Sequence, residues 1–595
     1  MASMNITKSK FMEYIRCKRY PALNHIHKRK DMDDVMRDRF YDIIESLEGF
    51  DNMDDDFLEP DLSHLEVMMP YFTHVELLAA RKVMSLFGGE TRYGLEYGTQ
   101  KLFMRDLDNF NLMCYVDVYN KNDNGINIIE VKATTSNKFL NLGWSEEGVK
   151  TSIFYVDDDN ILRLKEEIDP DILSNKKYIK NRNKLLNRFT DEGVYVYDLA
   201  FQRYVIEEDI KDAKYYLGVI NHEYVFDGTY IDGEPLYTNE SIRLVDLTKI
   251  TKEMLAKMKN EILEVIYRIT EDDESRVRLG KHCQLKKMRE CIYKDLCYDR
   301  FPKKNSLMMY MGKHNGFKDP DGEKHDVYDL IEEGYTSMLD IPHEWLTRRN
   351  NQIQRDVVLT EKAFIDRDKI RAGIDLLKYP IYHLDFESFP CPLPRFKGER
   401  PYMQSLFQFS LHIEKTPGLC DKEQDHYEFL AYNMSDLREE LVKKLVHLIK
   451  DDGGSVLVYN QAFEKTRIKE LAQFFPEYSE KLLKINERLF DLMHIVKTNT
   501  KLYEDLGFGT DRAKQVNYYH EDLSGSYSIK KVLPIFSELT YNGMEIGNGM
   551  EAVYAYAGFN GLTEAELKEK RHALTLYCQQ DTWAMVEILD NLRKI

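Results

Sequence analysis

Two acidic residues stand close together in the apolar run KYPIYHLDFESF of the C-terminal half. Asp385 and Glu387 are two positions apart, so a strand there places both carboxylates on one face. Carboxylates held this close repel each other unless a cation lies between them, and hard oxygen ligands suit Mg²⁺ or Mn²⁺. The pair therefore indicates either a divalent metal site or the end of a strand with two solvated acids.

Two later stretches carry residues that would complete such a site. Asn460 and Glu464 occur in VYNQAFEK, where a strand is expected to turn into a helix. Tyr577 and Asp581 occur in YCQQD, four positions apart, and so share one face of a helix. A tyrosine and an aspartate so placed would hold an attacking water and a metal ion together.

In this order, the three stretches make residues 380–595 resemble the DEDDy exonucleases of the RNase H-like superfamily. The usual second motif ends in aspartate, whereas this chain has Glu464 there, and Asp491 is an alternative fourth acid or an ordinary helix-start acid. The resemblance implies two Mg²⁺ or Mn²⁺ ions about 4 Å apart, which clamp the attacking and leaving oxygens. It also implies 3′→5′ hydrolysis from a single-stranded end of DNA or RNA. The implied catalytic residues are Asp385, Glu387, Glu464, Tyr577 and Asp581, with Asp385, Glu387 and Asp581 as metal ligands.

A second candidate site lies in the N-terminal half. Asp117 ends one expected strand, and Glu130 and Lys132 share a face of the next. The two acids could bind at least one Mg²⁺ or Mn²⁺ ion, while the lysine polarises a water or the leaving phosphate. A hairpin with a charged rim would give the same pattern without any catalysis.

Four cysteines bear on that choice. Cys17 lies near the start of the chain, and Cys283, Cys291 and Cys297 cluster far downstream. Four thiolates can bind a [4Fe-4S] cluster or, as the alternative, Zn²⁺. The spacing C-x7-C-x5-C is wide in its first gap, which leaves zinc open. The other four cysteines, Cys114, Cys391, Cys420 and Cys578, are scattered and are interpreted as core or incidental residues.

With the EVK stretch, this cysteine pattern makes residues 1–300 resemble RecB-like PD-(D/E)XK nucleases that carry an iron–sulfur staple. The resemblance implies a restriction-endonuclease-like fold. It also points to Glu76 as a further metal ligand, with His74 as its competitor. Gln202 is similar to the glutamine of the RecB-type Q-x-x-x-Y motif, although the tyrosine is out of register.

A basic strip, NKKYIKNRNKLLNRF (175–189), follows the EVK stretch and holds six basic residues and no acid. Such a strip is either a phosphate-binding surface or a solvated helix face. The candidate nucleic-acid contacts are Lys176, Lys177, Lys180, Arg182, Lys184 and Gln202.

The elements that position these residues alternate between strands and helices, which predicts a multidomain α/β chain. We expect a nuclease domain over 1–300, a mainly helical connector over 301–375 and an exonuclease domain over 376–595. The expected helices cover 75–87, 247–270, 528–536 and 574–594. The expected strands cover 111–120, 126–134 and 378–389. The stretch 193–208 is expected to begin as a strand, with a change to helix further along left open.

The composition limits the alternatives. The chain has 595 residues and a formal charge of 83 − 102 = −19, which argues against a polyanion-binding surface over the whole protein but not against a basic cleft. It has no apolar run of about 20 residues for a membrane span, and charges stand where a signal peptide would be apolar, so a cytoplasmic protein is expected. Two other functions stay open: an exonuclease whose N-terminal half is a nucleic-acid clamp, and a non-catalytic nucleic-acid-binding scaffold.

Overall fold

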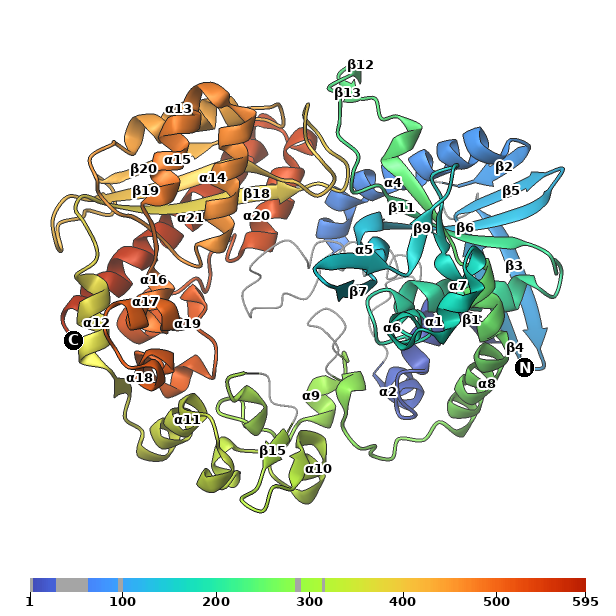
Figure 1. Cartoon of the computed structure of the whole chain (residues 1–595), viewed down its shortest axis with the longest axis horizontal. Coiled ribbons are helices and arrows are strands. Elements are labelled where there is room, and N and C mark those ends of the chain that lie inside the picture. Colours follow the sequence, from blue (N-terminus) through green and yellow to red (C-terminus); the bar gives the residue numbers. More distant parts are fainter. Residues whose placement is uncertain (1–3, 28–61, 95–99, 284–290, 313–315) are drawn as a thin grey trace. The chain divides into compact units, whose positions relative to one another are not determined.

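The computed structural model describes residues 4–27, 62–94, 100–283, 291–312 and 316–595, which form two compact units (Figure 1). Within the described residues, unit 1 runs to Cys297 and also includes 390–403, and unit 2 holds the remainder from Tyr298 onward. Both units mix helices and strands, so the predicted α/β class is confirmed. The change of unit after residue 297 lies close to the expected boundary at 300.

Unit 1 is built on a seven-stranded mixed sheet in the order β2-β5-β6-β11-β14-β10-β9, beside a three-stranded sheet in the order β1-β4-β3. In the larger sheet, β6 runs parallel to β11 and antiparallel to β5. The strands are β1 (Met4–Thr7), β2 (Glu90–Tyr93), β3 (Lys101–Leu107), β4 (Phe110–Val116), β5 (Val118–Asn122), β6 (Gly125–Thr135), β7 (Gly143–Glu146), β8 (Val149–Ser152), β9 (Phe154–Val156), β10 (Leu162–Leu164), β11 (Lys214–Ile220), β12 (Tyr230–Ile231), β13 (Glu234–Pro235) and β14 (Ile242–Asp246).

The helices of unit 1 cover these sheets. Helix α4 packs on β5 and β6, and α7 packs on β3, β4 and β11 and along α8. The apolar core that results joins α1, α7 and α8 to the sheets. The helices are α1 (Lys8–Tyr14), α2 (Tyr20–Ile26), α4 (Leu62–Phe87), α5 (Ser136–Leu140), α6 (Lys176–Arg182), α7 (Gly193–Ile206), α8 (Thr248–Glu271) and α9 (Lys294–Cys297).

Two expectations about unit 1 were wrong in detail. The single strand expected over 111–120 is broken at Asp117 into β4 and β5, which belong to different sheets. At the break, the carboxylate of Asp117 accepts a hydrogen bond of 2.8 Å from the backbone N–H of Val131. The stretch 193–208 does not begin as a strand: it is the helix α7 from Gly193 onward, buried over almost its whole length. Burial on every side hides the helical period that sequence interpretation relies on.

Unit 2 is built on a five-stranded sheet in the order β20-β19-β18-β21-β22. β18, β21 and β22 run parallel, and β20 pairs antiparallel with β19. The strands of the unit are β15 (Gly316–Lys318), β16 (Lys324–Asp326), β17 (Phe364–Ile365), β18 (Ile381–Pro390), β19 (Gln404–Glu414), β20 (His426–Leu430), β21 (Val456–Val458), β22 (Leu489–Asp491) and β23 (Tyr518–Tyr519).

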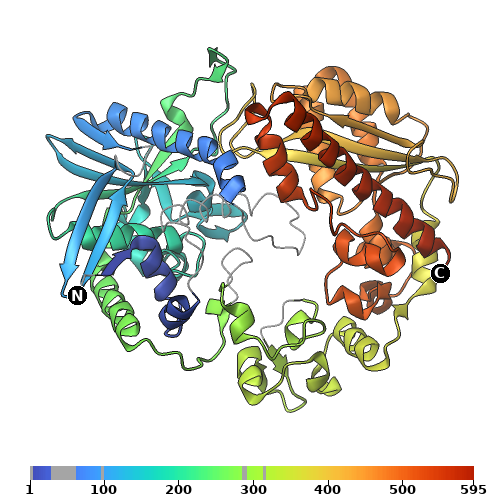
Figure 2. The same cartoon turned by 180° about the vertical axis from the view of Figure 1, so that it is seen from behind.

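Helices cover both faces of this sheet. Helices α13, α14 and α15 lie over one face and the long α21 over the other (Figures 1 and 2). The helices are α10 (Val327–Glu333), α11 (Arg349–Thr360), α12 (Arg367–Ile374), α13 (Arg438–Leu448), α14 (Ala462–Phe474), α15 (Ser479–Glu487), α16 (Leu492–Val496), α17 (Thr500–Asp505), α18 (Thr510–Lys514), α19 (Ile529–Phe536), α20 (Gly549–Ala557) and α21 (Glu564–Arg593).

The side chains of β18 alternate between an apolar face and a polar face of the sheet. Tyr382, Leu384 and Phe386 enter the apolar core beneath α13, α14 and α15. Because the period of a strand is two residues, His383, Asp385 and Glu387 point to the opposite face, toward α21. The period-2 prediction for Asp385 and Glu387 therefore agrees with the apolar face of the same strand.

The expected connector 301–375 is not a separate body, because unit 2 includes its described residues. It holds α10, α11 and α12, as expected of a mainly helical stretch, and also the β15–β16 hairpin. Residues 390–403, which join β18 to β19, pack within unit 1, where the hydroxyl of Tyr402 donates a hydrogen bond to the carbonyl of Ala133. None of the helices in the described part of the chain has both the length and the apolar composition that a membrane span needs.

Candidate functional site

The carboxylates of β18 lie beside α21. Asp385 is half-buried, and only 9 % of Glu387 is exposed. A carboxylate oxygen of each residue and the sulfur of Cys578 all lie within 4.8 Å of one another. Cys578, which the sequence interpretation set aside as incidental, therefore belongs to this group.

Tyr577 and Asp581 complete the group from α21, where both are buried. Burial raises the pKa of the Tyr577 hydroxyl well above its ordinary value, and the carboxylates of Asp581, Glu387 and Asp385 raise it further. This mutual influence shows that the first and third predicted motifs meet in space. The raised pKa keeps the Tyr577 hydroxyl protonated, so it can donate a hydrogen bond to a water or a phosphate oxygen.

A second tyrosine, which sequence reasoning missed, also contacts this group. The hydroxyl of Tyr541 donates a hydrogen bond of 2.7 Å to Oδ1 of Asp581, and its ring centroid lies 6.2 Å from that of Tyr577. Tyr541 lies between α19 and α20, and its position carries no motif and no periodic signal.

The polar face of β19 fixes where α21 sits on the sheet. The amide of Gln408 donates a hydrogen bond of 3.1 Å to the carbonyl of Leu574. Thr582 bonds at 2.8 Å to both Ser410 and His412. Because these bonds flank Tyr577 and Asp581 along the helix, they set the register of both residues against β18.

The second motif lies at the start of α14. Glu464 is buried in the first turn of this helix and acts electrostatically on Arg467. Asp491 is the N-cap of α16 and accepts hydrogen bonds from the backbone N–H groups of Asn460 (2.9 Å) and Gln461 (3.1 Å). The helix-start interpretation of Asp491 is thus confirmed, and its carboxylate also holds the turn that leads into Glu464.

In unit 1, the structure brings together the residues expected of the first nuclease site. Glu130 and Lys132 are both buried on β6, with Nζ of Lys132 3.2 Å from Oε1 of Glu130. Gln202 of α7 donates a hydrogen bond to Oε2 of Glu130. Gln202 is therefore a partner of the acidic centre and not an exposed nucleic-acid contact.

Two further residues of this centre were missed by the sequence analysis. Nζ of Lys8, on α1, lies 2.5 Å from Oε1 of Glu130 and 4.0 Å from Oδ2 of Asp198. Lys132 reaches the same Asp198 at 3.2 Å. Two ammonium groups thus stand between two carboxylates. Asp198 precedes Gln202 by one helical turn on α7, which is the signal that could have found it.

The acids of this centre have opposite electrostatic surroundings. Burial alone would raise the pKa of Glu130, but the Lys8 and Lys132 ammonium groups outweigh it and lower the pKa to about 2. The pKa of Asp117 is held well above its ordinary value by burial and by the carboxylates of Glu130 and Glu76. The carboxylates of Glu130 and Glu76 thus act electrostatically on Asp117, although in the described part of the chain the three acids are not among the groups of possible ligands whose atoms all lie within 4.8 Å of one another.

Glu76 also lines a pocket, together with Met69, Phe72, Thr73, Val75, Val131 and Ala133. The pocket runs past the strand that carries Glu130 and Lys132. His74, the competitor of Glu76, packs its ring against Tyr237 at a centroid distance of 5.3 Å. Of the two candidates, Glu76 is the one that acts electrostatically on Asp117.

The four predicted cysteines also converge. Burial raises the pKa of the Cys283 thiol to about 11, and the thiols of Cys291, Cys17 and Cys297 raise it further. The backbone N–H of Cys291 donates a hydrogen bond of 3.0 Å to the carbonyl of Cys283. Residues 284–290 between them lie outside the described part of the chain. The start and the end of unit 1 thus meet at these cysteines.

The spacing and surroundings of the thiols bear on what they could bind. In the described part of the chain, the cysteines are not among the groups of three whose ligand atoms lie within 4.8 Å of one another. A single zinc ion needs sulfurs roughly 3.8 Å apart, from bonds of about 2.3 Å, whereas a cluster separates them more widely because each thiolate binds a different iron. Nη1 of Arg19 lies 3.5 Å from the sulfur of Cys297, and Arg16 and Arg268 act on Cys291 and Cys17. These cations suit a group of thiolates.

The basic strip divides into two kinds of residue. Arg182 is buried, with Nε 2.5 Å from Oε2 of Glu166 and Nη2 2.6 Å from Oε1 of Glu253, so it is not accessible to phosphate. The expected role of Arg182 is therefore wrong, because the acids that neutralise it come from elsewhere in the chain. Lys177 is exposed and 3.1 Å from Glu146, and Lys176, Lys180 and Lys184 are exposed.

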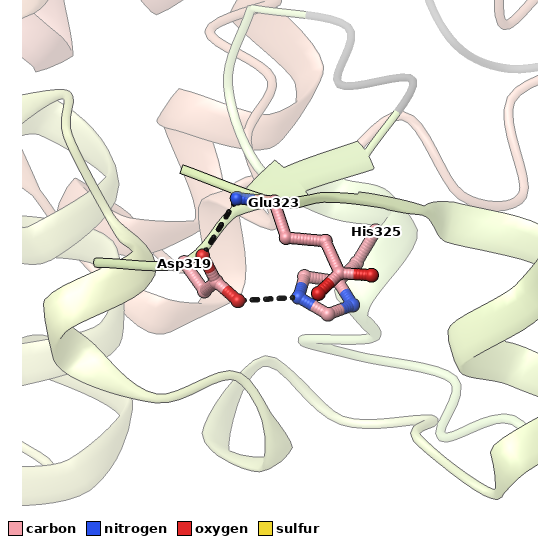
Figure 3. A group of neighbouring side chains, drawn as sticks. All are labelled: Asp319, Glu323 and His325. Atoms are coloured by element: carbon pink, nitrogen blue, oxygen red, sulfur yellow. Dashed lines mark hydrogen bonds and ion pairs between the residues drawn. The ribbon is translucent and has the colours of Figure 1, made fainter. Parts of the chain in front are cut away.

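A third group of possible ligands lies in the β15–β16 hairpin (Figure 3). Ligand atoms of Asp319, Glu323 and His325 lie within 4.8 Å of one another. Asp319 accepts a hydrogen bond of 2.8 Å from the backbone N–H of Glu323 and lies 3.1 Å from Nε2 of His325, whose ring stacks on Trp345. The contacts of Asp319 close the hairpin turn, which accounts for the group without an ion.

Comparison with known proteins gives a family without a described activity. A family model described as a domain of unknown function (DUF2779) matches residues 382–528, which include Asp385, Glu387, Glu464 and Asp491 but not Tyr577 or Asp581. The uncharacterized protein UU173 of Ureaplasma parvum is 28 % identical over 244 residues, 38 % of this chain and 33 % of its own. The uncharacterized protein MG366 of Mycoplasma genitalium is 28 % identical over 245 residues, 39 % of this chain and 34 % of its own. The matched part is thus about a third of the length of these relatives. No solved structure matches.

Proposed function

We propose that this chain is a metal-dependent nuclease that hydrolyses phosphodiester bonds of DNA or RNA, with a 3′→5′ exonuclease site in unit 2 and a RecB-like site in unit 1. The observation that carries the proposal is the meeting of Asp385 and Glu387 with Tyr577 and Asp581. These residues are nearly 200 positions apart in the chain, and the exonuclease resemblance requires them to converge. The mixed sheet with α21 across its polar face fits the expected RNase H-like fold.

The donor set of unit 2 suits a pair of Mg²⁺ or Mn²⁺ ions. Asp385, Glu387 and Asp581 offer the hard oxygen ligands that these ions prefer. When bound, the ions would supply the Lewis acidity that activates a water and stabilises the leaving oxygen. Tyr577, protonated and beside the three carboxylates, orients the water, and Tyr541 holds Asp581 in place.

The donor set of unit 1 supports the second site. Asp117, Glu130 and Glu76 would hold a divalent ion, and Lys132 would polarise the attacked phosphate or its leaving oxygen. The convergence of Cys17, Cys283, Cys291 and Cys297 supports a [4Fe-4S] staple that closes the unit, with Zn²⁺ as the alternative.

Digestion of end-labelled DNA and RNA by the full chain, purified without oxygen, tests the proposal. Asp385→Asn removes a metal ligand of unit 2 and is expected to abolish shortening from the 3′ end. Lys132→Met is expected to lower the rate of the remaining cleavage, which we assign to the site of unit 1, by a factor of about 100 or more. Glu480→Gln, a change at an exposed acid of unit 2, is the matched control.

The outcomes separate the candidate functions. If wild type binds single strands but cuts no substrate with Mg²⁺ or Mn²⁺, the protein is a binding scaffold and the proposal is wrong. If Lys132→Met leaves cleavage of every substrate unchanged, unit 1 is a clamp that serves the site of unit 2.

A further inference from the structure

Cys578 stands within the carboxylate site of unit 2, although the exonuclease resemblance gives it no role. It precedes Asp581 by three residues, so α21 presents the two side chains on the same side. Its side chain is fully buried. The spacing of 4.8 Å or less among its sulfur and the oxygens of Asp385 and Glu387 is short enough for one ion to contact all three.

The chemistry of this set differs from that of a site made of carboxylates alone. Mg²⁺ selects oxygen ligands, whereas a thiolate favours softer ions such as Zn²⁺ and Cd²⁺. Two carboxylates and one thiolate supply three negative charges to a divalent ion, and the tetrahedral preference of Zn²⁺ leaves a fourth position for water.

We propose that Asp385, Glu387 and Cys578 bind one thiophilic divalent ion of the zinc class in the exonuclease site. The inference deepens the proposed function, since it concerns the metal preference of the same site. On binding, the Cys578 thiol loses its proton to solvent and a metal–sulfur bond forms. Such an ion binds the carboxylate oxygens of Asp385 and Glu387 that Mg²⁺ needs as ligands. Zinc-class ions therefore inhibit cleavage that depends on Mg²⁺.

Cadmium titration of the full chain tests the sulfur ligand directly. Cadmium–thiolate bonds absorb in the ultraviolet, and the four cysteines of unit 1 contribute equally to every protein compared. Wild type is expected to show one more saturable step of this absorption than Cys578→Ser. Cys420→Ser, which removes a half-buried thiol of the same unit outside the group, is expected to match wild type.

Carboxylate variants provide an arm that keeps the thiol. Asp385→Asn and Glu387→Gln retain Cys578 but remove an oxygen ligand, and each is expected to weaken the same step by at least tenfold in cadmium concentration. Equal steps in wild type and Cys578→Ser, or an unchanged step in both carboxylate variants, would overturn the proposal. Circular dichroism of each variant shows whether it is folded, and Cys578→Ala replaces Cys578→Ser if the latter is not.

Cleavage assays separate this inference from the proposed function. The zinc concentration that halves the Mg²⁺-dependent rate, measured against the rate of each variant without zinc, is expected to rise about tenfold in Cys578→Ser. A cadmium step that depends on Cys578 in a protein without nuclease activity upholds the site and refutes the function. Nuclease activity together with a cadmium step that is the same in wild type and Cys578→Ser supports the proposed function and refutes the metal site.

Discussion

The hydroxyl of Tyr541 donates a hydrogen bond of 2.7 Å to Oδ1 of Asp581, and both side chains are buried. A buried carboxylate with one fixed oxygen presents its other oxygen in a defined direction. Tyr541 is therefore a positioning residue for the third motif of the proposed exonuclease.

Replacing Tyr541 by phenylalanine removes the hydroxyl that donates this hydrogen bond. We expect the rate of 3′ shortening to fall about 10- to 100-fold, as for other residues that orient metal ligands. The free energy of unfolding should fall by about 1–3 kcal/mol, because a buried acceptor loses its donor. Single-turnover cleavage at varied Mg²⁺ measures the first effect and urea denaturation the second. Tyr427→Phe, at an exposed tyrosine of β20, serves as the control, and equal rates in the two variants would refute the assignment.

Lys8 would compete with the divalent ion proposed for unit 1, because its ammonium lies 2.5 Å from the carboxylate of Glu130. In Lys8→Gln the competing charge is gone, so we expect the Mg²⁺ concentration for half-maximal cleavage by unit 1 to fall about tenfold, which is on the order of 1 kcal/mol. Metal titration in an Asp385→Asn background isolates this site. Lys10→Gln, at a lysine that donates a hydrogen bond to the carbonyl of Asn5, should leave the midpoint unchanged. A higher midpoint in Lys8→Gln would show that Lys8 assists binding instead.

Arg182 stabilises unit 1 through Glu166, whose side chain is fully buried. In Arg182→Ala that carboxylate loses its closest partner, and we expect the free energy of unfolding to fall by about 3–5 kcal/mol. Lys180→Ala, at an exposed neighbour on the same helix, should change it by less than about 0.5 kcal/mol. Chemical denaturation of both proteins decides the point, and similar stabilities would restore Arg182 as a surface residue.

Glu414 makes unit 2 sensitive to acid. Burial would raise its pKa, but hydrogen bonds to His383 and Arg593 outweigh that effect and lower the pKa to about 2, against 4.5 for an ordinary glutamate. A carboxyl whose pKa is lowered by folding stabilises the fold fully above pH 4.5 and loses that contribution as the pH falls toward 2. Burial also lowers the pKa of His383, so protonation of this histidine in the unfolded chain acts in the same direction.

Glu414→Gln should therefore be less stable than wild type by about 3 kcal/mol at pH 7. The difference should shrink as the pH falls from 4.5 toward 2. Urea denaturation at pH 7, 5 and 3 measures it, with the exposed Glu480→Gln as control. A difference that stays constant over this range would contradict the ion pair.

The cysteines predict a chromophore and a loss of stability on its removal. Protein purified without oxygen should be brown and hold iron and sulfide near four per chain. Cys297→Ser should lose the colour and unfold at a lower temperature. A cluster that binds the folded protein but not the unfolded chain stabilises the fold, and this variant loses that contribution. Cys420→Ser should keep both properties. A colourless protein with one zinc ion would establish the alternative.

Local geometry made the central residues of both sites predictable. The two-residue period of β18 and β6 and the four-residue spacing on α21 fixed which side chains share a face, and the structure brings those faces together. The register of α21 against the sheet could not be predicted from the sequence, because contacts such as that between Ser410 and Thr582 join distant segments.

Residues without a periodic or motif signal escaped prediction, and so did Asp198, although it precedes Gln202 by one helical turn. Lys8, Asp198 and Tyr541 interact with partners that folding brings near. Cys578 was dismissed because a single cysteine in a helix carries no pattern. Arg182 was misassigned because the basic strip itself contains no acid. Glu166 and Glu253, which neutralise Arg182, lie elsewhere in the sequence. In each case the deciding interaction is long-range.

Residues 390–403 belong to unit 1, yet β18 precedes them and β19 follows them in unit 2. No single cleavage of the polypeptide therefore yields both units intact. A fragment ending near residue 300 lacks the Tyr402 hydroxyl that bonds to the carbonyl of Ala133, directly after Lys132. A fragment starting at residue 404 lacks β18 and with it Asp385 and Glu387. Separating the two units therefore requires moving residues 390–403 by transplantation or circular permutation, because truncation does not keep both units intact.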